Sequence, residues 1–221
     1  MTVESIQIKE TLAYPWASEN VLKRLLIGAT ITLFGIFAFP LFISFGYYTR
    51  SLTDTIAGED NPPALSKSEL WPLFKLGGGA IVILGVYALL TTIAAVGLTA
   101  AFGVATTGGL IGENIAAHMT TFAVVAVLLG IGTAYIAPAS LARYGQSGSV
   151  FDGFRVLPIC TTTFTLSYLL GMAFSVMLLG VVFAVLALSS LIPPVGIVLA
   201  LCSKFPTVLL ISRAHGNGIS A

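Results

Sequence analysis

Long apolar runs separated by short polar stretches make up most of the chain. Four segments contain no Asp, Glu, Lys or Arg: 25–49, 76–112, 114–142 and 156–203. A membrane-spanning helix needs about 20 mainly apolar residues, so the first and third segments fit one helix each. The second fits a long helix and a turn, and the fourth is long enough for two helices. Because a helix satisfies its own backbone hydrogen bonds in lipid, we expect helices throughout.

The pattern predicts an all-α fold, a polytopic transmembrane helical bundle of about five spans with short interfacial helices. The whole chain, 1–221, would be a single integral membrane domain, with 1–20 as an interfacial N-terminal segment whose Tyr14 and Trp16 suit the headgroup level. The motif SSLIPP is the natural break between the last two helices. The expected spans lie near 21–48, 78–103, 115–137, 160–188 and 195–212.

Local signals refine the first half of the chain. We expect Pro40 to kink the first helix, which then continues past Tyr47 into water and ends with Gly58 at the C′ position. Ser66 and Glu69 have the spacing of a capping box. They predict a short interfacial helix before the second span.

A similar series of signals follows the third helix. Ser149 and Asp152 again have capping-box spacing, and Phe154 takes a place like that of Trp71 in the first series. The matched positions suggest a parallel repeat of two units, each made of a helix, a polar turn, an interfacial helix and a second helix. Since the matched residues are few, coincidence is the alternative interpretation.

Composition supports a membrane environment. Hydrophobic residues make up 57% of the chain and charged residues 9%, against roughly 25% charged in an ordinary globular domain. The mean hydropathy is +0.99. A net charge of +1 without a basic cluster indicates no nucleic-acid partner. Cys160 and Cys202 lie in apolar segments and offer neither a disulfide framework nor metal-ligand spacing.

The basic residues give a preferred orientation. With five spans, one side of the membrane would hold Arg50, Lys67, Lys75, Arg143, Arg155 and Arg213, and the other Lys9, Lys23 and Arg24. The positive-inside rule favours a cytoplasmic position for the loop within 47–75 and for the C-terminus, although the three basic residues before the first span argue the other way. We expect a multi-pass protein of the cell membrane.

Several motifs resemble one known family. They are ETLAYPW, then a helix ending in PLFISFGYYTRSL, then AGEDNPP, and then the aromatic segment ELWPLFKLG. Together they resemble an uncharacterised multi-pass membrane family of haloarchaea and other prokaryotes, a domain of unknown function. The resemblance spans about residues 8–215 and is most specific between Tyr14 and Gly77. It implies an archaeal or other prokaryotic integral membrane protein and carries over no functional residues.

Lys204 is the first candidate functional residue. In a helix that starts at Val195 it would lie about 14 Å from the helix start, near the bilayer centre. A charge there costs at least ~2.5–3.5 kcal/mol and indicates a functional site by default. The alternative is a helix displaced or broken at Pro206, from which Lys204 extends to the interface.

Glu113 and His118 form the second candidate, because a carboxylate and an imidazole at the start of a helix could relay protons or bind a metal. Ordinary interaction of Glu113 with the helix dipole is the alternative. Arg155 is the last candidate. It has i, i+3 spacing from Asp152 and could pair with it, and with other scattered basic residues it could meet anionic lipid headgroups.

No arrangement of nucleophile and base, and no metal-binding motif, is visible, so we assign no catalytic, cofactor-binding or metal residues and expect no cofactor. Only His118, His215 and Lys204 could activate a serine. The leading interpretation is a non-enzymatic membrane protein that acts through lipid contacts or as a subunit or assembly partner of a membrane complex, including a homo-oligomer. The alternative is a small transporter or channel, and an intramembrane enzyme comes third.

Overall fold

The computed structural model describes residues 8–16, 21–33, 38–107, 115–189 and 193–220. These residues form helices and short connections with no β-strand, so the predicted all-α class is confirmed. The helices are α1 (Ile8–Ala13), η2 (Tyr14–Trp16), α2 (Val21–Leu33), α3 (Ala38–Ile56), η3 (Lys67–Glu69), α4 (Leu70–Thr107), α5 (Ile115–Ser147), η4 (Val150–Phe154), α6 (Val156–Thr163), α7 (Leu166–Ser189) and α8 (Pro193–Ser220).

Four of the described helices are long and apolar enough to cross a membrane. The candidate spans are Leu70–Phe102, His118–Ser147, Leu166–Ser189 and Gly196–Ser220. Their amino acids explain this directly, because between Leu76 and Phe102, and between Leu166 and Ser203, the chain carries no charge. The protein is therefore an apolar helical membrane protein, with shorter helices around its long ones.

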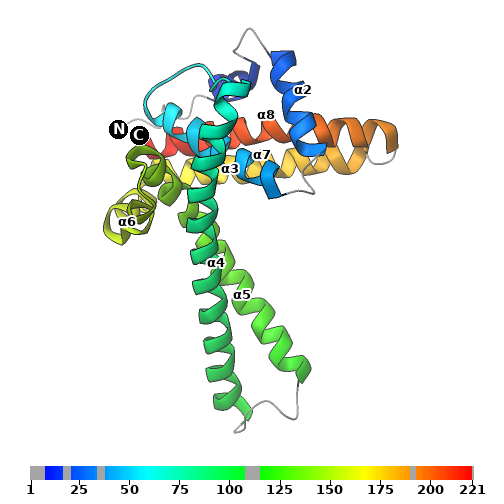
Figure 1. Ribbon diagram of the computed structural model, residues 1–221. Helices are drawn as coiled ribbons and strands as arrows, with labels where there is room; N and C mark the ends of the chain where they lie inside the picture. The colour runs from blue at the N-terminus through cyan, green and yellow to red at the C-terminus, as the bar shows by residue number, and fades with distance from the viewer. Residues whose placement is uncertain (1–7, 17–20, 34–37, 108–114, 190–192, 221) are drawn as a thin grey trace.

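The long helices form two hairpins that leave a common centre in different directions. In Figure 1, α4 and α5 run downward together, whereas α7 and α8 lie side by side and run across them. We call the centre the hub, where α3, the first half of α4, the end of α5 and the second half of α8 pack together. Its interior contains Tyr47, Leu52, Ile83, Tyr144 and Leu209, all buried.

Glycines let the helices of the hub approach closely. A methyl group on Gly46 would overlap the carbonyl of Leu73, and one on Gly77 would overlap the carbonyl of Phe42. Gly171 and Gly218 do the same between α7 and α8, where an added Cβ on Gly171 would lie 2.7 Å from the carbonyl oxygen of Ala214. The two helix pairs are thus held at backbone-to-backbone contact by residues without side chains.

The region expected as a single kinked helix near 21–48 contains two helices. α2 ends at Leu33 and α3 begins at Ala38, while the residues between them lie outside the described part. Pro40 is the third residue of α3, in the first turn, where proline is tolerated. Neither helix is among the four candidate spans.

The end of α3 agrees with the prediction. Gly58 has φ +83°, its N–H donates to the Thr55 carbonyl at 3.0 Å, and the Glu59 N–H donates to the Asp54 carbonyl at 2.9 Å. These two bonds form a Schellman motif with glycine at C′. The chain then crosses the surface of the hub to Ser66.

The predicted interfacial helix before the second span does not exist as a separate element. α4 is continuous from Leu70 to Thr107, with Pro72 in its first turn. The capping box does not form either. Ser66 Oγ lies 2.8 Å from Ser68 Oγ, and the Glu69 carboxylate is instead an ion-pair partner of Arg50.

In the second half of the chain, one expected helix is instead found as two. The helix expected near 160–188 is divided into α6 and α7 at Phe164 and Thr165. Thr165 causes the new start, because its Oγ1 accepts a hydrogen bond from the Tyr168 N–H at 3.2 Å, as an N-cap does. One suggested unit thus has a continuous helix and the other a broken one. The parallel repeat stays a prediction.

The N-terminal segment also differs in position from the one expected from the distribution of basic residues. α1 and η2 pack against α8, and Asn217 at the end of α8 donates to Thr11 at 3.4 Å. Lys9 belongs to α1, so its helix lies at the hub with the helix of Arg213 rather than on an opposite side.

Candidate functional site

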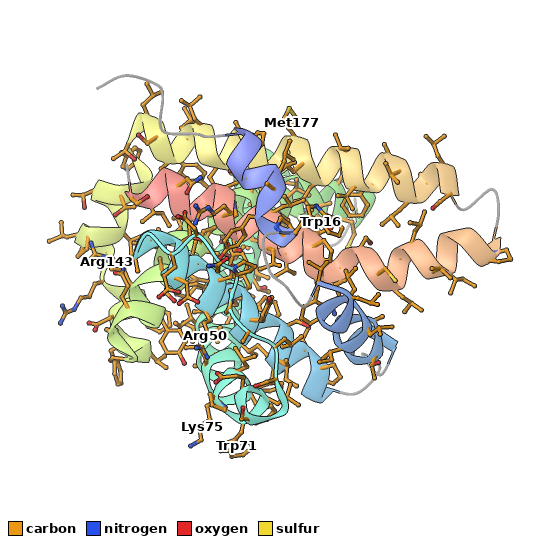
Figure 2. The ribbon with its side chains drawn as sticks, turned by 90° about the horizontal axis from the view of Figure 1, so that it is seen from above. Trp16, Arg50, Trp71, Lys75, Arg143 and Met177 are labelled. Atoms are coloured by element: carbon orange, nitrogen blue, oxygen red, sulfur yellow. The ribbon has the colours of Figure 1, made fainter. Side chains whose placement is uncertain are left out.

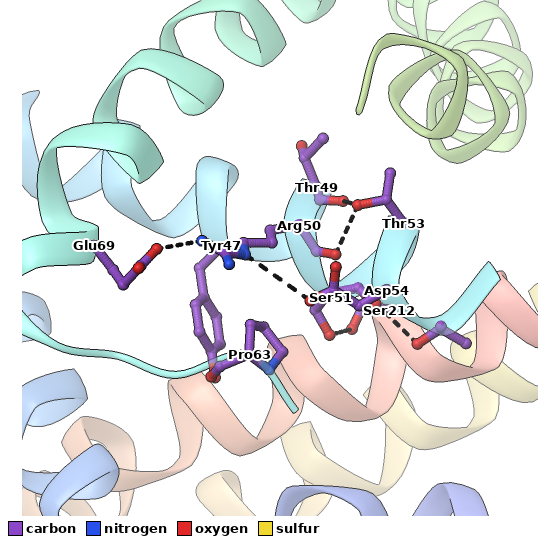
Figure 3. Close-up of polar contacts among 10 residues, drawn as sticks. Tyr47, Thr49, Arg50, Ser51, Thr53, Asp54, Pro63, Glu69 and Ser212 are labelled. Atoms are coloured by element: carbon purple, nitrogen blue, oxygen red, sulfur yellow. Dashed lines mark hydrogen bonds and ion pairs between the residues drawn. The ribbon is translucent and has the colours of Figure 1, made fainter. Parts of the chain in front are cut away.

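Buried polar side chains connect α3 and α8 inside the hub. Ser51 Oγ and Ser212 Oγ lie 2.7 Å apart, and neither residue is exposed. One turn away, the Tyr48 hydroxyl lies 2.6 Å from Nδ1 of His215. Figure 3 shows the serine pair among the polar contacts of α3. Hydrogen bonds between buried groups fix the register of the two helices, because a lost partner costs the full desolvation of the other group.

Arg213 holds three parts of the chain together. Nη1 donates to the Glu59 carbonyl at 2.7 Å and Nη2 to Asp60 Oδ1 at 3.1 Å. Its guanidinium carbon lies 4.8 Å from the centre of the Tyr14 ring, a cation–π contact. Arg213 thus joins η2, the loop after α3, and α8. Burial of Tyr14 raises the pKa of its hydroxyl.

A second group of charges lies at the side of the hub. Arg50 of α3 forms an ion pair with Glu69 and lies 4.0 Å from Asp54 (Figure 3). Burial raises the pKa of Asp54, and the charge of Glu59 adds to that rise while Arg50 opposes it. The Arg50–Glu69 ion pair joins α3 to η3, directly before the start of α4. We interpret this group of charges as one that stabilises the fold.

An open cavity lies where α5 ends and η4 begins. It has a volume of about 170 Å³ and is lined by Arg143, Gln146, Ser147, Asp152 and Arg155. Arg155 Nε lies 2.9 Å from Asp152 Oδ1, so the pair suggested by the i, i+3 spacing does form. We call this cavity the Arg143–Arg155 pocket. With two guanidinium groups and one carboxylate, it is suited to an anion.

Large exposed apolar side chains follow one another closely in the chain around and after the pocket residues Asp152 and Arg155. Phe151, Leu157 and Phe164 are 84%, 82% and 86% exposed. Phe151 lies in η4, Leu157 lies in α6, and Phe164 is the C-cap residue of α6. Side chains of this kind at a membrane surface enter the acyl layer, so these residues favour a place for the pocket at headgroup level.

The structure separates the other candidates. Lys204 lies in α8, is partly buried, and forms no ion pair within the described residues. His118 lies near the start of α5, at the far end of the α4–α5 hairpin from the hub. Glu113 lies outside the described residues. In the described part, no three His, Cys, Asp or Glu residues come close enough to hold a metal ion.

Sequence reasoning missed the most connected polar residues. His215 appeared only as one of three bases for a serine, and Arg213 only as a basic residue near the C-terminus. His215 is 7% exposed, and its Nε2 has no hydrogen-bond partner in the described part of the protein. Both residues follow a run of apolar residues, and the expected span ended at 212. Their burial could have been predicted only by extending the expected last helix to Ser220, where α8 ends.

This geometry defines a class, namely a helical membrane protein with a polar hub and two apolar hairpins. The comparison with known families agrees with it. Residues 30–199, well over half of the chain, match the family described as a protein of unknown function, DUF4013, and the chain belongs to that family. The expected membership of a domain of unknown function is thereby confirmed, while the haloarchaeal source stays a prediction. No curated protein and no solved structure matches the chain.

Proposed function

We propose that the protein is a non-enzymatic subunit or assembly partner of a membrane complex in the cell membrane, held there by lipid contacts of its apolar hairpins. The observation that carries this proposal is the direction of the hairpins. The α4–α5 pair and the α7–α8 pair run crosswise (Figure 1). If one pair crosses a flat bilayer upright, the other pair must therefore lie along the surface of that bilayer.

The α4–α5 hairpin is the better candidate for the upright position. Only 11% of the residues in the most apolar window of each helix are buried, so nearly the whole surface of this hairpin is apolar and open. Lipid chains satisfy such a surface. The hub, with its charged loops, would then lie at one membrane surface, and the positive-inside rule favours the cytoplasmic one.

The α7–α8 hairpin then needs another cover. Eight of the large apolar side chains of α7 are each about half exposed or more: Leu166, Leu169, Val176, Met177, Val181, Phe183, Val185 and Leu188. Full burial of such a side chain is worth about 1.5–3 kcal/mol, so covering these exposed parts is worth roughly 7–14 kcal/mol in total. Helices of a partner protein, or of a second copy, would supply this cover.

Site-specific photocrosslinking in native membranes tests the proposal. We expect a crosslinker at Met177, which lies on the surface of α7 in Figure 2, to trap one protein partner in high yield. A crosslinker at Asn61, exposed on the loop after α3, is the matched control and should not trap it. Capture of lipid alone at Met177 would refute the proposal.

A small transporter or channel is the second candidate, and Lys204 is the observation that favours it. Lys204 is partly buried in the apolar helix α8 and has no ion pair in the described residues. The free energy needed to place such a charge in a membrane is high, so a charged residue there indicates a function. This function predicts that Lys204→Leu abolishes a solute flux measured in proteoliposomes while insertion is normal. Equal flux in the variant and the parent would exclude it.

A further inference from the structure

The two arginines of the Arg143–Arg155 pocket come from different elements. Arg143 lies four residues before the end of α5, and Arg155 follows η4. Between them the chain turns at Gly148, whose φ is +70°. This turn folds η4 back against α5, so both arginines are among the residues that line one cavity. Figure 2 shows Arg143 at the edge of the molecule, directed outward.

The charges of the pocket select for an anion. Asp152 engages Nε of Arg155, which orients this guanidinium and leaves its two terminal amino groups for another partner. Arg143 forms no ion pair in the described part of the chain. Gln146 adds a neutral hydrogen-bonding group, while the Ser147 hydroxyl is bonded to the backbone of Ser149. Planar guanidinium groups bind phosphate oxygens in a bidentate manner, so phosphate is the anion that fits this set of donors.

The surroundings indicate a lipid as the source of the phosphate. Phe151 and Leu157 are among the most exposed apolar side chains of the molecule and lie on either side of the pocket residues Asp152 and Arg155 in the chain. A soluble phosphate site would gain nothing from such neighbours. A site at the membrane surface would, because apolar side chains in the acyl layer hold the arginines at the level of the headgroups.

We propose that the Arg143–Arg155 pocket binds the phosphate group of an anionic membrane lipid, with Phe151 and Leu157 inserted beside it. This site is independent of a protein partner on α7. A basic residue at an anionic membrane surface contributes about 1 kcal/mol, which corresponds to about a fivefold change in affinity. Because bidentate contact in a pocket is stronger than general attraction to a surface, replacing either arginine should lower the affinity for the lipid at least about fivefold.

Native mass spectrometry of the purified, delipidated full-length protein measures this directly. Phosphatidylglycerol and phosphatidylcholine are titrated separately in the same detergent, and the bound fractions give the two affinities. We expect tighter binding of phosphatidylglycerol to the parent protein. Arg143→Gln and Arg155→Gln should each weaken phosphatidylglycerol binding about fivefold or more and leave phosphatidylcholine binding unchanged.

Lys75→Gln is the matched control, because it removes one positive charge from an exposed side chain that lies over Trp71, away from the pocket residues. A loss with Lys75→Gln equal to that with Arg143→Gln would overturn the proposal, since general attraction would then explain the binding. Full displacement of phosphatidylglycerol by an equal concentration of inorganic phosphate would also overturn it, because the site would then be one for free phosphate. Unfolding midpoints of all variants in detergent show that each is folded.

Discussion

Arg213 and Asp60 form an ion pair whose two members should differ greatly in importance. The Arg213 side chain is 9% exposed and the Asp60 side chain 88%. Arg213 also donates to the Glu59 carbonyl and contacts the Tyr14 ring. We therefore expect Arg213→Met to destabilise the protein far more than Asp60→Asn does.

The magnitudes follow from the contacts. A hydrogen bond that involves a charged group contributes about 1.5–3 kcal/mol, and a cation–π contact about 0.5–2 kcal/mol. Arg213→Met should thus cost about 2–5 kcal/mol. Asp60→Asn removes only the charge of an exposed carboxylate and keeps an oxygen that can accept from Arg213, so it should cost about 0–1 kcal/mol. Tyr14→Leu removes the aromatic ring that contacts Arg213, while Tyr14→Phe keeps the ring and removes only the hydroxyl, so the difference between the two variants measures the cation–π contact.

The assay is reversible unfolding of the purified protein in mixed micelles, followed by the tryptophan fluorescence of Trp16 and Trp71. Comparable losses for Arg213→Met and Asp60→Asn would refute the reasoning. They would mean that the loop after α3, rather than η2 and the buried guanidinium, carries the stability of this contact.

Other changes test the fold at separate points by the same unfolding assay. Gly77→Ala should cost about 1–3 kcal/mol by overpacking against α3, while Gly85→Ala, with open space around it, should gain up to about 1 kcal/mol. Thr165→Ala should cost about 1 kcal/mol by removing the N-cap of α7. Because the pKa of Asp54 is raised on folding, stability should fall as pH rises from the ordinary Asp range through that raised pKa, and Asp54→Asn should abolish this slope.

The sequence predicted the class of the fold and several local features. Charge-free runs identified the apolar helices, and Gly58 was recognised as the C′ residue that ends α3. The Asp152–Arg155 pair was readable from i, i+3 spacing. These features depend on residues close in the chain, so local rules suffice for them.

Contacts between distant segments were beyond such rules. The meeting of Arg143 with Arg155 depends on the turn after α5, and the pairing of Tyr48 with His215 joins residues 167 positions apart. The start of α7 at Thr165 depends on a single side-chain hydrogen bond, which competes with continuation of the helix.

The central claim is that another protein covers α7, and native mass spectrometry of the intact particle tests it most directly. The tagged protein is purified from its own membrane in mild detergent and its composition is weighed. We expect a particle that contains a stoichiometric second protein or a second copy. In that particle the thiol of a Met177→Cys variant that lacks Cys160 and Cys202 is protected from a maleimide added after purification. A monomer that retains only lipid, with this thiol open to the reagent, would contradict the proposal.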